Sequence, residues 1–321
     1  TEAVGQVLCH DITQIIPGVT KDAVFRKGHI IREEDIPVLL SVGKDSVYIW
    51  ENDETMMHEN DAAEVLYRMT ANEHMHPSDV KEGKIEVIAD TEGLLKVDRE
   101  KLKKVNAFGE MMIATRHGNT VVKKGDKLAG TRIIPLVIKK DKMQEAEKIC
   151  DGTPILKILP FTVKKAAIIT TGNEVYHGRI KDAFTPVIEQ KIAEFGAEMM
   201  FHEIFDDNDR KITDGCLRAI EAGADIVFCT GGMSVDPDDK TPLAIKNTGA
   251  EMISYGSPVL PGAMFLLSYY RKGDKVIPIC GLPGCAMYNR RTIFDLVLPR
   301  LMAADPVTAD ELASLGEGGL C

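Results

Sequence analysis

The stretch CTGGMSVDPDDKTP, residues 229–242, follows an apolar segment and contains two glycines, a serine and three aspartates. The preceding residues 224–228, ADIVF, have the composition of a buried strand. Gly231 and Gly232 leave backbone N–H groups accessible and tolerate positive φ angles, so they suit an anion such as phosphate. Ser234 adds a hydroxyl donor. The stretch therefore predicts a strand that ends in an anion-binding loop.

The three aspartates of this loop would by themselves repel a phosphate. A divalent cation such as Mg²⁺, held by one or two carboxylates and by the phosphate, removes that conflict. We expect an aspartate of this loop to hold the cation and Lys240 to neutralise remaining negative charge. A plain surface turn, in which Asp236 and Asp238 only cap the next helix, is the alternative interpretation.

The chain around this loop alternates short apolar strands with amphipathic helices. Strands are predicted at residues 166–171, 199–205, 225–230 and 250–254, helices at 184–195, 209–222 and 241–248, a hairpin around 271–274 and a last helix after Gly284. This order is typical of a mostly parallel sheet with helices on both faces. We predict a three-layer α/β/α domain at 161–303, an α+β domain at 1–160 and a tail at 304–321.

Several loops of the same character follow the other predicted strands. They contain Gly172-Asn173-Glu174, Asp206-Asp207, Pro261-Gly262 and Pro283-Gly284. Ligands bind beyond the carboxyl ends of the strands in such sheets, so we expect these loops to form one binding site. The Asp206-Asp207 pair could equally be the N-cap of the next helix.

The first 160 residues give weaker signals. Strands are predicted at 47–50, 84–89, 111–116 and 132–138, and helices at 33–40, 60–70, 99–104 and 141–150. Cys9-His10-Asp11 suggests a nucleophile, but neighbouring residues of a strand point to opposite faces. The segments 58–61 and 73–76 contain histidines that could bind a metal, but a helix start capped by Asn60 or Asp61 and a polar loop are the commoner explanations.

Composition limits the classes of function. The net charge of −10 argues against general binding of nucleic acid, which calls for a basic field. No apolar run is long enough to span a membrane and no signal peptide opens the sequence. The seven cysteines lack CxxC spacing and are expected to be reduced. We expect a cytoplasmic protein that has a small-molecule ligand.

The second half resembles the molybdopterin-binding domain shared by molybdopterin adenylyltransferases, molybdopterin molybdotransferases and proteins of the competence-damage-inducible type. The resemblance rests on TTGNEV (170–175), GRIKDAF (178–184), FDDND (205–209), TGGMSVDPDDKTP (230–242), SPVLPGAMF (257–265) and GLPGCAMY (281–288), in family order. It resembles a molybdotransferase without that family's β-rich C-terminal domain.

This resemblance implies a Mg²⁺-dependent insertion of molybdate into adenylylated molybdopterin, which releases AMP. It assigns catalytic roles to Asp239, Asp182 and Glu174, and metal binding to Asp239 and Asp207. The cofactor-binding positions it implies are Gly172, Asn173, Gly231, Gly232, Ser234, Lys240, Thr241, Pro261, Gly262, Pro283 and Gly284. The expected ligand is molybdopterin or its adenylylated form.

The match departs from the molybdotransferase pattern at several positions. Asn173 replaces an aspartate, Phe184 an asparagine, Asp236 a glycine and Ala263 a lysine. Two alternatives therefore stay open: a nucleotide pyrophosphatase of the competence-damage-inducible type, and a non-catalytic carrier or sensor of molybdenum cofactor. A homo-oligomer or a molybdenum-enzyme partner is also compatible with the sequence.

Overall fold

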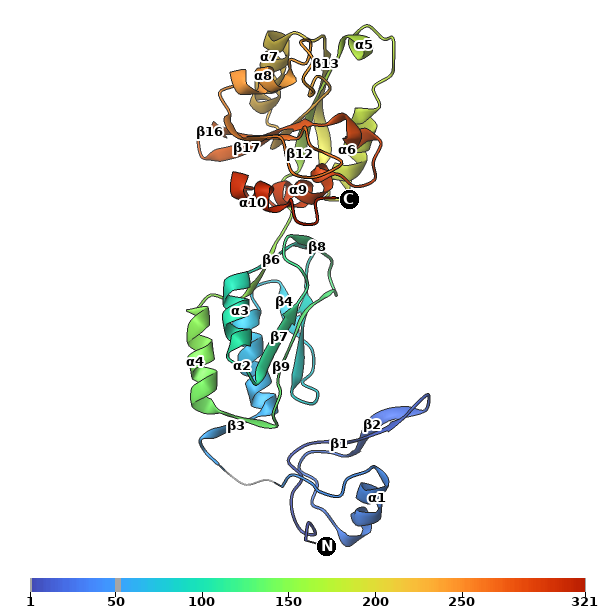
Figure 1. The fold of residues 1–321 in the computed structure, drawn as a ribbon, viewed down its shortest axis with the longest axis vertical. Coiled ribbons are helices and arrows are strands. Elements are labelled where there is room, and N and C mark those ends of the chain that lie inside the picture. Colours follow the sequence, from blue (N-terminus) through green and yellow to red (C-terminus); the bar gives the residue numbers. More distant parts are fainter. Residues whose placement is uncertain (1, 50–52, 321) are drawn as a thin grey trace. The chain divides into compact units, whose positions relative to one another are not determined.

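The computed structural model describes residues 2–49 and 53–320 (Figure 1). Its contacts divide the chain into two compact units. Unit 1 comprises residues 1–91, 96–118 and 122–158, and unit 2 comprises residues 92–95, 119–121 and 159–321.

Unit 2 is built on a six-stranded sheet in the order β13-β12-β14-β17-β16-β15. The strands are β12 (Lys165–Thr171), β13 (Glu198–Phe205), β14 (Ile226–Thr230), β15 (Glu251–Tyr255), β16 (Leu266–Lys272) and β17 (Lys275–Leu282). The pairs formed by β13, β12, β14 and β17 are parallel, and β16 is antiparallel to both of its neighbours. The predicted mostly parallel sheet is confirmed.

Helices cover both faces of this sheet, which makes three layers (Figure 1). The helical elements are α5 (Asn173–Tyr176), α6 (Phe184–Ala193), α7 (Asp209–Glu221), α8 (Thr241–Asn247), η2 (Gly284–Met287), α9 (Ile293–Met302) and α10 (Ala309–Ser314). Ile212 of α7 and Ile245 of α8 are buried on one face, and Ile188 of α6 and Phe294 of α9 on the other. The α/β/α class is therefore as predicted.

The segment predicted to be a tail contains α10 and belongs to unit 2. Leu312 of α10 is buried in the same core cluster as α9. Arg300 of α9, only 6% exposed, pairs with Asp305 and with Glu311. These contacts hold α10 against α9 and the core that α9 shares with the sheet.

Parallel register places the carboxyl ends of four strands at one edge of the sheet. Thr170 pairs with Thr230, and Thr230 pairs with Leu282, so β12, β14 and β17 end side by side. Thr171 pairs with Phe205 at the end of β13. The loops that begin at 172, 206, 231 and 283 therefore leave the sheet from the same edge.

Unit 1 contains a four-stranded antiparallel sheet in the order β4-β5-β9-β7, with α2, α3 and α4 packed beside it (Figure 1). Its elements are β1 (Ile12–Ile16), β2 (Thr20–Phe25), η1 (Glu33–Asp35), α1 (Ile36–Ser41), β3 (Met56–His58), α2 (Glu59–Thr70), β4 (Met75–Pro77), β5 (Lys84–Ala89), α3 (Arg99–Ala107), β7 (Met111–Thr115), β9 (Lys127–Ile133), β10 (Val137–Lys139) and α4 (Lys140–Cys150). The remaining strands are β6 (Gly93–Val97), β8 (Thr120–Val122) and β11 (Leu156–Leu159).

Three expectations for unit 1 were wrong in detail. The strand predicted at 132–138 is two strands, β9 and β10, because Pro135 between them has no N–H for a sheet. The strand predicted at 47–50 is reduced, in its described part, to a bridge between Ile49 and Leu8; Trp50 lies outside the described residues. His58, rather than Asn60 or Asp61, is the N-cap of α2.

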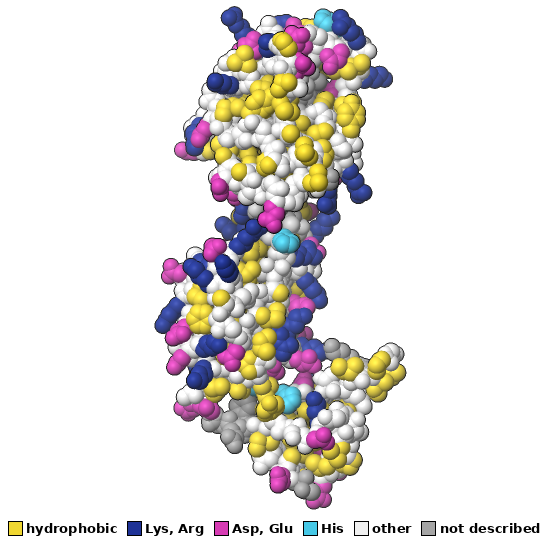
Figure 2. Space-filling model, viewed as in Figure 1, with side chains coloured by type: hydrophobic (Ala, Val, Ile, Leu, Met, Phe, Trp, Pro, Cys, Tyr) yellow, Lys and Arg dark blue, Asp and Glu magenta, His cyan; other side chains and the backbone are white. Residues whose placement is uncertain are grey.

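Surface charge in the molecule is mixed. On the face shown in Figure 2, Lys and Arg side chains are interspersed with Asp and Glu side chains. None of the helices in residues 2–49 and 53–320 combines the length and the apolar character that crossing a bilayer requires.

Candidate active site

The loop after β14 turns sharply against the end of β12. Gly231 has φ 81°, and a Cβ atom at this position would lie 2.1 Å from the carbonyl oxygen of Thr171. Gly232 has φ 53°, and its Cβ would lie 2.9 Å from the Thr241 hydroxyl. Side chains at either position would push the loop off the sheet edge, so both glycines are required by the geometry.

Two further contacts hold this loop in place. The Tyr255 hydroxyl donates to the carbonyl oxygens of Met233, at 3.0 Å, and Ser234, at 3.2 Å. The Thr241 N–H donates to the Gly232 carbonyl at 3.2 Å. The carbonyl oxygens of Gly232, Met233 and Ser234 thus accept hydrogen bonds from within the protein. We expect the N–H groups of the two glycines to be available to a ligand.

A cavity of about 620 Å³ lies against this loop in unit 2. Its polar wall includes six of the predicted site residues besides the two glycines: Glu174, Asp182, Ser234, Asp239, Pro283 and Gly284. A Cβ atom at Gly284 would meet nothing within 4 Å, because this residue faces open space. The volume falls in the range of small-molecule and cofactor sites.

The lining also contains apolar and aromatic residues. Phe184, Met233, Met264, Met287 and Tyr288 contribute to it. The sequence analysis did not assign these residues to the site, because an apolar side chain that follows a strand is commonly part of the hydrophobic core. Their position in the segments 178–184, 230–242, 257–265 and 281–288, which carry the family resemblance, was the signal that could have found them. The cavity can therefore offer both polar groups and apolar surface to a ligand.

The acidic residues around the cavity lie close enough to interact. Burial raises the pKa of Asp207 above its usual value, and the carboxylates of Glu174, Asp238 and Asp239 raise it further, against a hydrogen bond from the Asn173 N–H. That bond is 3.1 Å long. Four carboxylates thus share one negative region, which a cation would stabilise.

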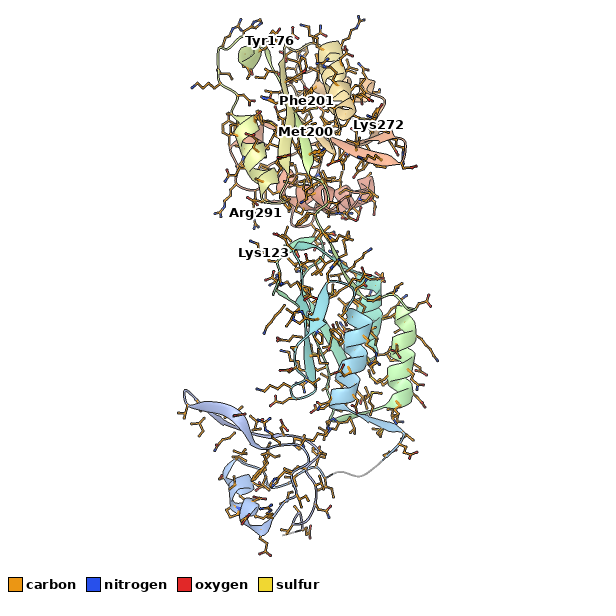
Figure 3. All side chains as sticks on the ribbon, turned by 180° about the vertical axis from the view of Figure 1, so that it is seen from behind. Lys123, Tyr176, Met200, Phe201, Lys272 and Arg291 are labelled. Atoms are coloured by element: carbon orange, nitrogen blue, oxygen red, sulfur yellow. The ribbon has the colours of Figure 1, made fainter. Side chains whose placement is uncertain are left out.

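Asp206 and Asp207 have different surroundings although they are adjacent. Lys211 forms an ion pair with Asp206 at 2.7 Å and also lies 5.8 Å from the ring centroid of Tyr176. Tyr176 is the last residue of α5 (Figure 3). Asp207 instead meets the carboxylates named above. The helix that follows is capped by Asn208, whose side chain accepts from the Lys211 N–H, so the predicted acidic cap is wrong.

Asp182 is held by several donors. Its carboxylate accepts from the hydroxyls of Thr170, at 2.9 Å, and Thr185, at 2.5 Å, and from the N–H groups of Phe184 and Thr185. Burial acts to raise the pKa of Asp182, but these hydrogen bonds outweigh it and the pKa lies below its usual value. Asp182 is therefore a fixed carboxylate that positions the start of α6 and lines the cavity.

Asp239 lines the cavity and also forms hydrogen bonds within its own turn. Its carboxylate accepts from the Asp236 N–H at 3.0 Å, and its own N–H donates to the Asp236 carbonyl at 2.9 Å. These two bonds close the turn that the sequence suggested. Burial raises the pKa of Tyr255, and the charge of Asp239 contributes to the same shift.

The other predicted site residues do not line the cavity. Gly172, Asn173 and Asp207 lie behind it at the ends of β12 and β13, and Lys240 and Thr241 begin α8. Gly262 packs against Ile293, where a Cβ atom would come within 2.4 Å of the isoleucine side chain. Pro261 accepts from the Ile293 N–H at 3.3 Å. These residues shape the loops that form the wall.

In unit 1, the structure shows the surroundings of Cys9-His10-Asp11 and of the histidines at 74 and 76. The Cys9 thiol lies 3.8 Å from His10 Nδ1, but burial raises the pKa of Cys9 and lowers that of His10. His76 pairs with Asp90 at 2.7 Å, and His74 has φ 67°. Within the described residues, no group of three or more His, Cys, Asp or Glu side chains is arranged to hold a metal ion by itself. The six described cysteines are free.

Comparison with known families now adds to this geometry. Residues 167–303, which contain every wall of the cavity, match the family described as "Probable molybdopterin binding domain". This segment is a member of that family. Residues 1–51 match a second family, "Domain of unknown function (DUF8806)".

Curated relatives match part of this chain. A Bacillus cereus protein whose name describes it as competence-damage inducible is 30% identical over 129 residues, which are 40% of this chain and 30% of that protein. A Bacillus subtilis protein of the same name is 32% identical over 85 residues, 26% of this chain and 20% of that protein. The chain thus spans less than a third of the length of these relatives.

Two solved structures are similar to part of this chain. The tungsten cofactor synthesizing protein MoaB of Pyrococcus furiosus has a TM-score of 0.38 and 18% identity, over 45% of this chain and 98% of that one. The protein CinA of Thermoplasma acidophilum has a TM-score of 0.35 and 17% identity, over 43% of this chain and 98% of that one.

Proposed function

We propose that unit 2 binds adenylylated molybdopterin in the 620 Å³ cavity and catalyses, in the cytoplasm, the Mg²⁺-dependent insertion of molybdate with release of AMP. One observation carries this proposal. One cavity of a molybdopterin-binding domain is lined by a glycine loop, a second glycine turn, the carboxylates of Glu174 and Asp239, and apolar and aromatic side chains.

The anionic groups of such a substrate would lie along the polar wall. Gly231 and Gly232 present backbone N–H groups, Ser234 presents a hydroxyl, and Gly284 leaves open space at the start of η2. Preorganised donors of this kind bind phosphate oxygens without reorganisation during reaction. The pterin ring would lie against Phe184, Met287 and Tyr288, where an aromatic face suits a flat heterocycle.

The acidic side chains fit a hard divalent cation. Asp239 and Asp207 are the residues that would hold Mg²⁺, because their carboxylates lie in the shared negative region described above. Mg²⁺ commonly takes only one or two carboxylates and completes its shell with water and phosphate, so three protein ligands are not needed. When bound, it supplies charge neutralisation of the phosphoanhydride.

The residues of this chain then have distinct tasks. The glycine loop orients the phosphoanhydride, and the fixed Asp182 carboxylate keeps α6 and its Phe184 at the wall. Water attacks the adenylyl phosphorus, the P–O–P bond breaks, AMP carries the water oxygen, and the pterin phosphate is the leaving group. The pterin dithiol then takes up molybdate: two Mo–S bonds form, and one molybdate oxygen leaves as water with the two thiol protons. The Tyr255 hydroxyl holds the loop at the position these donors need.

The experiment that tests this proposal has two steps. Purified protein is first titrated with molybdopterin and with its adenylylated form, and micromolar binding, about 8 kcal/mol, is expected. AMP release is then followed with molybdate and Mg²⁺ present. Binding together with molybdate-dependent release supports the transferase, whereas binding without release supports a carrier.

A second candidate follows from the curated relatives. Their names belong to the competence-damage-inducible group, and Ala263 lines the cavity where a molybdotransferase-type lysine is expected. A nucleotide pyrophosphatase would use the same loops to hold a dinucleotide. Hydrolysis of a dinucleotide, without binding of any pterin, would support this candidate.

A further inference from the structure

Unit 1 contains a polar cavity of its own, of about 280 Å³. Three segments line it: residues 10–27, the start of α2 and residues 79–82. Two motifs that are far apart in the sequence, Cys9-His10-Asp11 and His58-Glu59-Asn60, meet at this place. Nothing in the proposed function of unit 2 uses it.

Specific hydrogen bonds hold these segments together. His58 is only 4% exposed; its Nε2 donates to the Cys9 carbonyl at 2.8 Å, and its Nδ1 accepts from the Asn60 N–H at 3.2 Å. The Lys27 ammonium also lies 3.1 Å from His58 Nδ1. The Thr13 hydroxyl also donates to Glu82 at 2.9 Å across 69 residues. These hydrogen bonds hold the segments that line the cavity in place.

Most carboxylates of this cavity already have a donor. Asp11 accepts from the Lys27 N–H at 2.7 Å, Asp22 from the Ala23 N–H at 2.8 Å, and Glu82 from the Thr13 hydroxyl. Asp79 is exposed to solvent. These four groups need no ligand.

Glu59 differs from all of them. It is 9% exposed, and among the residues the structure describes no donor lies within hydrogen-bond distance of its carboxylate; the nearest cation is Arg132, at 4.0 Å. The helix start at α2 offsets only part of the cost of burial, and burial raises the pKa of Glu59 above its usual value. Glu59 also borders an adjoining cavity of about 290 Å³. A buried acceptor that faces a cavity without a donor fits a ligand that brings N–H groups.

Cations also line the same cavity. Arg26 and Lys81 line it, and neither forms an ion pair with another described residue. A guanidinium and an ammonium in this position suit a carboxylate or a phosphate. The cavity therefore offers a buried acceptor and a pair of cations to one ligand, and its volume limits that ligand to the size of a small metabolite.

We propose that unit 1 is a binding module for a small zwitterion, whose ammonium or amidine group pairs with Glu59 and whose carboxylate or phosphate group pairs with Arg26 and Lys81. The proposal gives a role to the segment that matches the domain of unknown function, residues 1–51, together with the start of α2.

Calorimetric titration of the full chain tests this proposal. The probes are O-phosphoethanolamine and L-serine, which carry an ammonium beside a phosphate or a carboxylate. Ethanolamine and inorganic phosphate, each of which carries only one of the two kinds of charged group, are the matched controls. At least one zwitterion should bind at least tenfold more tightly than both single-charge probes, and the tighter of the two zwitterions identifies the anionic group.

Variants assign the binding to this cavity. Glu59→Gln and Arg26→Gln should each weaken zwitterion binding at least tenfold. Glu100→Gln removes an exposed acid from the first turn of α3 and should leave binding unchanged. Because Glu59 has no donor, Glu59→Gln should keep the melting temperature of the wild type; if it does not fold, the exposed Arg26→Gln still decides. The proposal is wrong if neither zwitterion binds, if the single-charge probes bind equally well, or if Arg26→Gln binds like the wild type.

Discussion

The hydroxyl groups of Thr171 and Thr241 lie 3.0 Å apart, although 70 positions separate them in the chain. Thr171 uses its proton on the Thr230 carbonyl at 3.1 Å, so Thr241 is the donor of the bond between the two hydroxyls. This contact joins the end of β12 to the start of α8. It thereby closes the loop 231–240 at both ends.

Thr241→Val removes this closing bond while keeping the side-chain shape. We expect a loss of about 1 kcal/mol in the free energy of unfolding and a several-fold weaker affinity for molybdopterin. Thr248→Val is the matched control, since the buried Thr248 donates to the Ile245 carbonyl at 2.6 Å at the other end of α8. It should cost similar stability in a denaturant titration and leave the affinity unchanged. Equal affinities for wild type and Thr241→Val would show that the bond does not shape the loop.

Gly231→Ala tests whether the loop must approach the sheet as closely as observed. Gly249 has almost the same φ, 84° against 81°, but a Cβ atom there would meet nothing within 4 Å. Gly249→Ala should therefore cost only the left-handed backbone strain, about 1–2 kcal/mol. Gly231→Ala should cost more and should abolish measurable pterin binding, because its Cβ would meet the Thr171 carbonyl. Similar losses for the two variants would contradict the close-approach argument.

The sequence predicted the sheet of unit 2 well because its strands are short apolar runs between caps and glycines. Residues such as Ile168, Val227 and Ile279 are fully buried, and that burial gives the pattern its clarity. Unit 1 was harder to predict. Its strands are interrupted, as at Pro135, and a buried histidine took the capping position at α2.

The site was predictable in its polar half only. Glycines and aspartates after strands have a direct physical meaning, and the loop at 231–234 and Asp239 do line the cavity. The apolar wall was not predictable from local pattern, because Met264 or Tyr288 could as well pack in a core. The role of Tyr255 was also hidden, since its two bonds to the loop cross more than twenty positions of the chain.

Tyr255→Phe removes the hydroxyl that holds Met233 and Ser234. Tyr255 is 46% exposed, so we expect a small change in stability, below about 1 kcal/mol. The loop should become more mobile, and affinity for the pterin substrate should fall several-fold. Amide hydrogen exchange at residues 231–235 and a binding titration measure both effects. Unchanged exchange in the variant would mean that the hydroxyl is not the restraint.

Asp207→Asn should stabilise the protein at neutral pH. The pKa of Asp207 is raised by burial and by neighbouring carboxylates, so its ionised form opposes folding. That penalty is fully present above the folded-state pKa, shrinks as the pH falls through it, and vanishes below the ordinary value of 3.8. Melting curves of both proteins between pH 7 and pH 3 should therefore converge at low pH. A variant that is less stable than wild type at pH 7 would contradict this sign.

Release of AMP from adenylylated molybdopterin, with molybdate and Mg²⁺ present, tests the central claim most directly. Wild-type protein is compared with Asp239→Asn, which keeps an acceptor for the Asp236 N–H, and with Asp236→Asn as the control on the exposed side of the same turn. The account predicts molybdate- and Mg²⁺-dependent release by wild type and by Asp236→Asn, and at least a hundredfold slower release by Asp239→Asn. Wild-type protein that binds the substrate but releases no AMP, or equal rates for wild type and Asp239→Asn, would contradict it.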